Sequence, residues 1–149
     1  MVKAREHEQN DGTNLTGARR NADVVYCYLS ALFIVGVLVQ VFLAGVGVFG
    51  MNALKVQNAS SFDLHRNFGE VLGLLSVVML ILALVARFSR RTIFETLTLV
   101  LLVEVAQHGL AAAGDSNKWV GGLHALDGMI ILVLALVLYL SARKRTNLP

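Results

Sequence analysis

The chain has 149 residues, of which 56% are hydrophobic and 15% are charged, and its formal net charge is +3. A soluble domain usually carries about 25% charged residues and about 45–50% apolar ones, so the composition excludes an ordinary soluble globular protein. The basic residues gather in short segments between apolar runs. The positive charge is therefore a sign of membrane topology and gives no reason to expect nucleic acid as a partner.

Long apolar runs follow one another along the chain, at residues 24–50, 68–86, 93–114 and 120–140. A helix needs roughly 20 apolar residues, at about 1.5 Å each, to cross the hydrocarbon core of a bilayer. Because backbone N–H and C=O groups find no water in lipid, each run must form a helix. The sequence predicts an all-α fold, an antiparallel bundle of four transmembrane helices joined by short loops.

Polar segments flank the predicted bundle. Residues 1–23 are polar and contain several Gly and Asn, which predicts a disordered tail. Residues 24–141 form the bundle, and residues 142–149 form a basic C-terminal tail. Arg and Lys are concentrated in both tails and in the middle loop "RFSRR". Because such residues stay on the cytoplasmic side, we expect both termini in the cytoplasm and a multi-pass protein of the bacterial inner membrane.

Two pairs of motifs repeat along the chain. "QVFLAGVG" from Gln40 and "QHGLAAAG" from Gln107 share the pattern Gln-x-x-Leu-Ala-x-x-Gly. Each is followed by an apolar run that opens with Leu-His-x-x-x-Gly, around His65 in the first copy and His124 in the second. This order predicts a bundle built from two repeated helical hairpins that run in the same direction. The two histidines then lie at the same depth on diagonal helices, and the two glutamines form a matching pair.

A facing pair of imidazoles inside a bundle suits haem, with His65 and His124 as axial ligands. Small residues follow the histidines on the same faces, at Gly69, Gly73, Ser76 and Gly128. They would leave room for a flat macrocycle, or they would only allow close helix packing. Arg66 is a cation available to the haem propionates, or it pairs with Glu70 four residues on.

His108 breaks the repeat, because its counterpart in the first copy is Val41. It lies one turn from Glu104 on the third apolar run. Together with His65, His124 and Asp127, these side chains offer the nitrogen and oxygen ligands that a divalent metal such as zinc takes. The alternative is a hydrogen-bonded polar cluster that holds helices together.

The pattern of Gln40, the pair His65-Arg66, then Gln107 and His124 resembles one four-helix half of haem A synthase. It is similar, more loosely, to the b561-type cytochromes and to an uncharacterised family of small bacterial four-helix membrane proteins. The resemblance implies that His65 and His124 bind haem. The catalytic glutamate of haem A synthase would fall three residues before the His-Arg pair, where this chain has Phe62. The resemblance therefore identifies no catalytic residue here.

Besides a metal or proton site built on Glu104, His108, His124 and Asp127, two hypotheses for function follow. The first is a small integral membrane protein that binds b-type haem (heme b) for electron transfer or redox sensing near the outer face. Gln40, Gln107 and Arg66 would complete the site, and a membrane protein complex and a quinone are its candidate partners. The alternative is a non-catalytic accessory subunit of a membrane complex, in which the same residues form only a buried polar cluster.

Overall fold

The computed structural model describes residues 2–53, 59–114 and 116–146, and its regular structure within these ranges is helical throughout. The elements in chain order are α1 (Val2–Ala53), the 3-10 turn η1 (Ala59–Phe62), α2 (Asp63–Val85), α3 (Arg90–Leu101), the π-helical segment η2 (Leu102–Gln107), α4 (His108–Gly114) and α5 (Lys118–Thr146). The predicted all-α class is confirmed.

Four helical stretches are long and apolar enough to cross a membrane, as the composition predicts. They are Gly17–Gly50, Asp63–Val85, Arg90–Gly114 and Lys118–Thr146. The third runs without a break through α3, η2 and α4. The molecule is therefore a multi-pass membrane protein whose helices contact the lipid bilayer.

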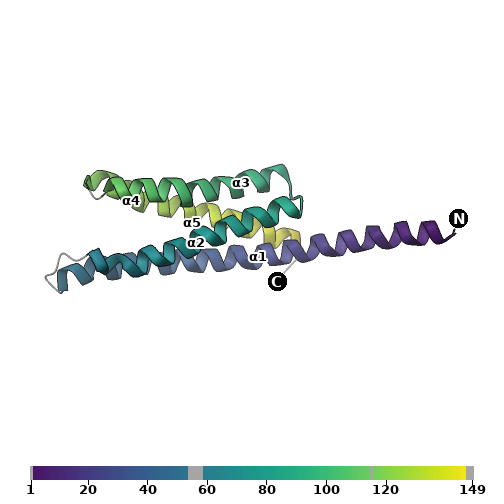
Figure 1. Ribbon diagram of the computed structural model, residues 1–149, viewed down its shortest axis with the longest axis horizontal. Helices are drawn as coiled ribbons and strands as arrows, with labels where there is room; N and C mark the ends of the chain where they lie inside the picture. Colours follow the sequence, from purple (N-terminus) through teal and green to yellow (C-terminus); the bar gives the residue numbers. More distant parts are fainter. Residues whose placement is uncertain (1, 54–58, 115, 147–149) are drawn as a thin grey trace.

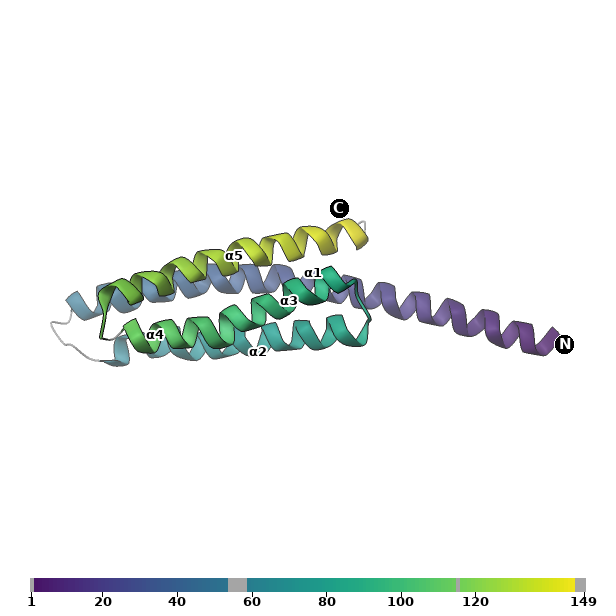
Figure 2. The same ribbon diagram turned by 90° about the horizontal axis from the view of Figure 1, so that it is seen from above.

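The four spans form a bundle in which α1 packs against α2 and α5, and α3 packs against the same two helices (Figure 1). This arrangement makes α2 and α5 one diagonal pair, and α1 and α3 the other. Figure 2 shows consecutive spans running in opposite directions. The predicted antiparallel hairpins, α1 with α2 and α3–α4 with α5, are thus present.

Helix α1 continues through residues 2–23, the segment that the sequence predicts to be a disordered tail, and its N-terminal part extends beyond the bundle (Figures 1 and 2). Residues 142–146, assigned to the C-terminal tail, likewise continue α5. The chain contains a single proline, Pro149, so no proline interrupts either helix. A helix that is already formed by its membrane span extends at little cost, because only nucleation is expensive.

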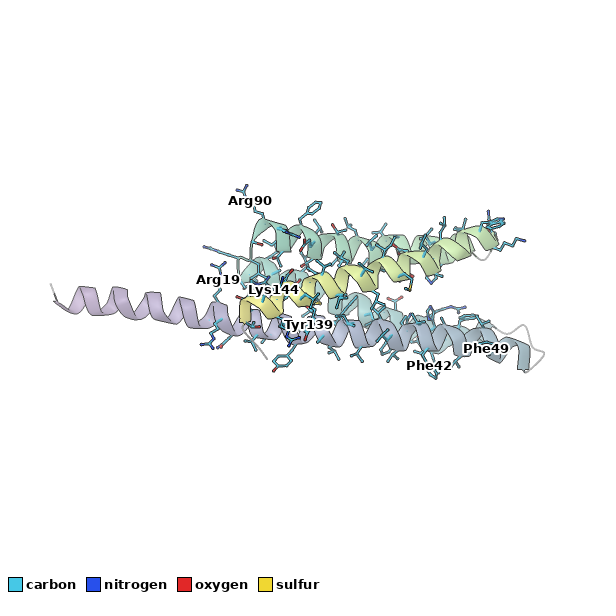
Figure 3. The ribbon with its side chains drawn as sticks, turned by 180° about the vertical axis from the view of Figure 1, so that it is seen from behind. Arg19, Phe42, Phe49, Arg90, Tyr139 and Lys144 are labelled. Carbon is cyan, nitrogen blue, oxygen red and sulfur yellow. The ribbon has the colours of Figure 1, made fainter. Side chains whose placement is uncertain are left out.

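The two ends of the bundle differ in composition. We call the end that carries Arg19, Arg90 and Lys144 the basic end, and Figure 3 shows these three side chains together, far from Phe42 and Phe49. The opposite end, where α2 and α5 begin, is called the histidine end because it carries His65 and His124. Outward-pointing Phe42 and Phe49 are 69% and 74% exposed, as expected for side chains that face lipid.

The fully buried apolar core lies toward the basic end. On α1 the buried apolar side chains run from Tyr26 to Val37, and on α2 they run from Leu72 to Ala83. Near the basic end, the Tyr26 hydroxyl also hydrogen bonds to the Thr96 hydroxyl at 2.5 Å, which links the α1–α3 diagonal. Packing and polar contacts therefore fix the bundle in this half, while the histidine end carries the polar contacts described next.

Candidate functional site

His65 of α2 and His124 of α5 meet across the bundle at the histidine end. Their ring centroids are 6.2 Å apart and the ring planes are inclined at 71°. Both rings are half-buried. The facing histidine pair predicted from the repeated motif is thus confirmed, and it lies on one diagonal of the bundle.

In the first hairpin, a glutamine and a histidine bind each other reciprocally. The Gln40 amide Nε2 donates to the backbone carbonyl of His65 at 2.8 Å. In return, His65 Nδ1 donates to the backbone carbonyl of Gln40 at 3.1 Å. Two hydrogen bonds therefore tie α1 to α2 at the depth of the histidine ring.

The second hairpin repeats this arrangement. Gln107 Nε2 donates to the carbonyl of His124 at 3.0 Å, and His124 Nδ1 donates to the carbonyl of Gln107 at 3.2 Å. The equivalence of Gln40 with Gln107, inferred from sequence alignment of the two copies, therefore holds in three dimensions. The repeat in the sequence encodes a repeated contact between neighbouring helices.

The glycine that follows each histidine by one turn leaves space for this contact. A Cβ atom on Gly69 would lie 3.0 Å from Gln40 Nε2, and one on Gly128 would lie 3.7 Å from Gln107 Nε2. Of the two interpretations of these glycines, close helix approach is therefore the one that the contacts support.

The hydrogen bonds also fix the tautomer of each imidazole. A carbonyl oxygen only accepts, so Nδ1 of both rings must carry the hydrogen. In a neutral ring the lone pair then resides on Nε2. Histidines that ligate metals in proteins usually donate their other ring N–H to a carbonyl or carboxylate in this way, which orients the ring.

The second N–H of each glutamine amide has a different partner in the two hairpins. Gln107 Nε2 also donates to Asp127 Oδ2 at 3.0 Å, and Asp127 is buried. The corresponding residue in the first hairpin is Phe68, and there Gln40 Nε2 lies 3.5 Å from His65 Nε2. Among the residues that the structure describes, Gln40 Oε1 is the buried side-chain polar atom that has no hydrogen-bond partner.

His108 lies apart from the facing pair and contacts α2 instead. Its Nδ1 donates to the carbonyl of Val103 at 3.2 Å, and its Nε2 lies 3.2 Å from Glu70 Oε1. Of the two alternatives for Arg66, the pair with Glu70 does not form: Arg66 contacts Asp63 Oδ1 at 3.5 Å, and Glu70 is paired with His108. Arg66 is exposed on the first turn of α2, next to His65.

A family model matches residues 40–114, which is 75 of the 149 residues. The chain belongs to the DUF6220 family of unknown function. The matched region of this DUF6220 protein includes Gln40, His65 and Gln107, and it ends before α5 and His124. No curated protein and no solved structure matches the chain, so these comparisons add no support to the resemblance to haem A synthase or b561-type cytochromes.

The divalent-metal hypothesis is not supported by the arrangement of side chains. Within the described ranges of this DUF6220 protein, no three His, Cys, Asp or Glu residues gather closely enough to hold a metal ion. His108 is paired with Glu70, and Asp127 is bound to Gln107. The Glu104 carboxylate packs against Gly73 of α2, where a Cβ atom would collide with it. The residues that the sequence places on shared helix faces therefore do not form a common set of metal ligands.

The sequence did not predict that the third span of the DUF6220 protein changes from α-helical to π-helical geometry in η2, at Leu102–Gln107. This segment carries Glu104 and Gln107, and His108 follows it directly. A π-bulge inserts an extra residue into a helix and is frequent at functional sites. The one available signal was the density of polar residues in this span compared with the other three.

Proposed function

We propose that this protein is a small membrane haem protein in which His65 and His124 are the axial ligands of one b-type haem. The separation of the two rings carries the proposal. Two metal–imidazole bonds of about 2 Å each, with the distance from nitrogen to ring centre added on both sides, give centroids on the order of 6 Å apart. The ring centroids are 6.2 Å apart.

The surrounding groups fit such a ligand pair. Both Nδ1 atoms are held by carbonyl oxygens, so Nε2 of each ring would be the ligand atom, and at His65 the ligand bond would replace the 3.5 Å contact with Gln40 Nε2. The buried Gln40 Oε1 is an acceptor without a partner among the described residues. Haem bound there would supply one-electron redox chemistry, which supports a role in electron transfer or redox sensing. Arg66, exposed beside His65, remains a candidate partner for the propionates.

We propose that the protein resides in the bacterial inner membrane with its basic end in the cytoplasm, because Arg and Lys favour that side. The histidine end then faces outward. One haem near one face does not carry electrons across a bilayer alone. The function therefore needs a partner, either a membrane protein complex or a lipid-soluble quinone.

The absorption spectrum of the purified protein, from cells supplied with a haem precursor, tests the proposal. We expect a Soret band that shifts on reduction with dithionite. The band should be lost in both His65→Ala and His124→Ala. His108→Ala is the matched control, because it removes a membrane histidine outside the pair and should leave the band unchanged. A colourless wild-type protein, or a band that survives in both single variants, contradicts the proposal.

A second candidate is the accessory subunit, and one observation favours it. The reciprocal Gln–His bonds give both ring N–H groups a partner without any ligand. They also give each glutamine amide a partner for one of its N–H groups. In that case the pair only joins helices, which is worth about 1 kcal/mol per interhelical bond. The accessory subunit predicts a colourless protein whose association with a larger complex weakens when the histidine end is altered.

A further inference from the structure

Basic side chains gather at one depth, where the spans end at the basic end of the bundle. Arg19 and Arg20 lie near the start of the first span, and Arg87 follows the end of the second by two residues. Arg90 is the first residue of the third span, and Lys144 lies in the last turn of the fourth (Figure 3). All of these side chains are exposed. Because the ends of membrane spans lie at the level of the lipid head groups, these cations are in the layer that carries the lipid phosphates.

The acids described at this end are already paired with other cations. Asp23 Oδ1 accepts a hydrogen bond from Arg145 Nε at 2.8 Å, and Glu95 Oε1 accepts one from Arg91 Nε at 2.8 Å. The other acids whose side chains the structure describes belong to the half of the spans nearer the histidine end: Asp63, Glu70, Glu104 and Asp127. Within the described side chains, the exposed cations named above therefore form no ion pair with a carboxylate.

The histidine end has no comparable excess of positive charge. The cations described there are Arg66, which contacts Asp63 Oδ1 at 3.5 Å, and Lys118, whose Nζ lies 5.7 Å from the centre of the Trp119 ring. In the described part of the chain, guanidinium groups without a carboxylate partner thus belong to the basic end.

The loop between α2 and α3 brings three of these arginines together. Arg19 Nη2 donates to the backbone carbonyl of Arg87 at 3.3 Å, which holds α1 against the loop. Arg87 has a φ of 51°, a left-handed conformation that is uncommon for a residue with a Cβ atom, and Arg90 follows it at the start of α3. The bond to the carbonyl uses one N–H of the Arg19 guanidinium and leaves its other N–H groups available to an anion.

The same loop is also held from α5. The Arg145 guanidinium lies 5.1 Å from the centre of the Phe88 ring, while its Nε is bound to Asp23 of α1. The loop is therefore fixed from two sides before any ligand arrives. Such pre-organisation lowers the cost of binding, because fewer groups must be ordered at that moment.

The charge and the depth of this cluster select its ligand. Neighbouring guanidinium groups without a carboxylate repel one another, and a phosphate accepts hydrogen bonds from arginine in a bidentate geometry. Phe94 follows Arg90 by one helical turn and is 70% exposed, which places the surface beside Arg90 against lipid. The phosphate at that depth belongs to a phospholipid. A zwitterionic lipid also brings a cation of its own, whereas an anionic lipid brings only negative charge.

We propose that Arg19, Arg87 and Arg90 form a binding site for the phosphate of an anionic phospholipid at the basic end of the bundle. Arg20 and Lys144 add to the positive potential around the site. The site lies at the end opposite His65 and His124, so it does not depend on the proposed haem.

Native mass spectrometry of the full chain in a neutral detergent, titrated with phosphatidylglycerol, tests the site. We expect one phosphatidylglycerol to be retained per chain at concentrations where phosphatidylcholine is not. Arg19→Gln, Arg87→Gln and Arg90→Gln should each weaken its binding about fivefold, which corresponds to about 1 kcal/mol for each cation near a phosphate. Lys118→Gln is the matched control, because it removes the same charge from an exposed side chain at the histidine end and should leave the affinity unchanged. Equal retention of the two lipids, or an equal loss in Lys118→Gln, overturns the proposal.

Photocrosslinking of the wild-type protein gives a test that needs no variant. Phosphatidylglycerol that carries a photoreactive group on its glycerol head should label the loop between α2 and α3 and the neighbouring part of α1, and excess phosphatidylcholine should not prevent this. Labels spread equally over both ends of the bundle contradict the site. Complete displacement of the lipid by inorganic phosphate or by polyglutamate also overturns the proposal, because it would identify a site for soluble anions or for an acidic protein segment.

Discussion

The two hairpins share one contact and differ in what surrounds it. Gln40 with His65, and Gln107 with His124, make the same pair of reciprocal bonds at distances between 2.8 and 3.2 Å. Only in the second hairpin does a buried acid, Asp127, take the other N–H of the amide. The repeated motif thus specifies how each hairpin closes, and the residues outside it decide how each histidine is used.

The difference bears directly on the two imidazoles. In the first hairpin the amide Nε2 of Gln40 lies 3.5 Å from His65 Nε2. In the second, Asp127 accepts the corresponding amide proton, so the lone pair of His124 has no such competitor within the described part of the chain. If the two rings bind one ligand, their two lone pairs are therefore inequivalent, although the two hairpins are nearly symmetric.

Replacing each glutamine by leucine should give the largest difference in stability between the two hairpins. We expect Gln107→Leu to lower the free energy of unfolding by about 3 kcal/mol, because it removes two donors and leaves the buried Asp127 carboxylate without its partner. Gln40→Leu should cost about 1 kcal/mol, since it removes one strong interhelical bond and also removes the unpartnered Oε1. Unfolding in dodecyl sulfate mixed micelles measures both.

The double variant Gln107→Leu with Asp127→Leu is the control for this prediction. It removes the buried carboxylate along with its donor, so most of the excess cost over Gln40→Leu should disappear. Equal losses in the two single variants would show that Asp127 does not distinguish the hairpins.

A second asymmetry lies between Gly73 on α2 and Glu104 in η2. In the second copy of the repeat, the residue equivalent to Gly73 is Leu132. A Cβ atom on Gly73 would collide with the Glu104 carboxylate. Because the Glu104 carboxylate is the far end of a flexible side chain and can shift, we expect Gly73→Ala to destabilise the protein by about 1 kcal/mol, the lower end of what overpacking costs. The same unfolding titration measures this loss.

Shortening the opposing side chain provides the matched test. Glu104→Ala should relieve most of the penalty of Gly73→Ala when the two are combined. If the combined variant loses the sum of both single effects, then the Glu104 carboxylate is not what requires glycine at this position.

The sequence was sufficient to predict the four spans, because length and apolar composition alone decide which segments cross a bilayer. It also predicted the facing of His65 and His124, since a duplicated hairpin places equivalent residues at one depth. It did not predict the partner of Glu70. A regular helix gave no reason for His108 to turn toward α2, and His108 directly follows the π-helical segment η2, which the sequence pattern does not indicate.

The glycine after each histidine offers the smallest and most discriminating contrast. In a helix, Gly→Ala usually stabilises by about 0.5–1 kcal/mol, because alanine loses less backbone entropy on folding. At Gly128 a new Cβ would lie 3.7 Å from Gln107 Nε2, an ordinary contact, so Gly128→Ala should show this gain. At Gly69 the corresponding atom would lie 3.0 Å from Gln40 Nε2, which is too close, so Gly69→Ala should lose it or become destabilising. Thermal unfolding of the two variants measures the difference in sign, and a gain of equal size at both positions would show that the Gln40 amide moves aside without cost.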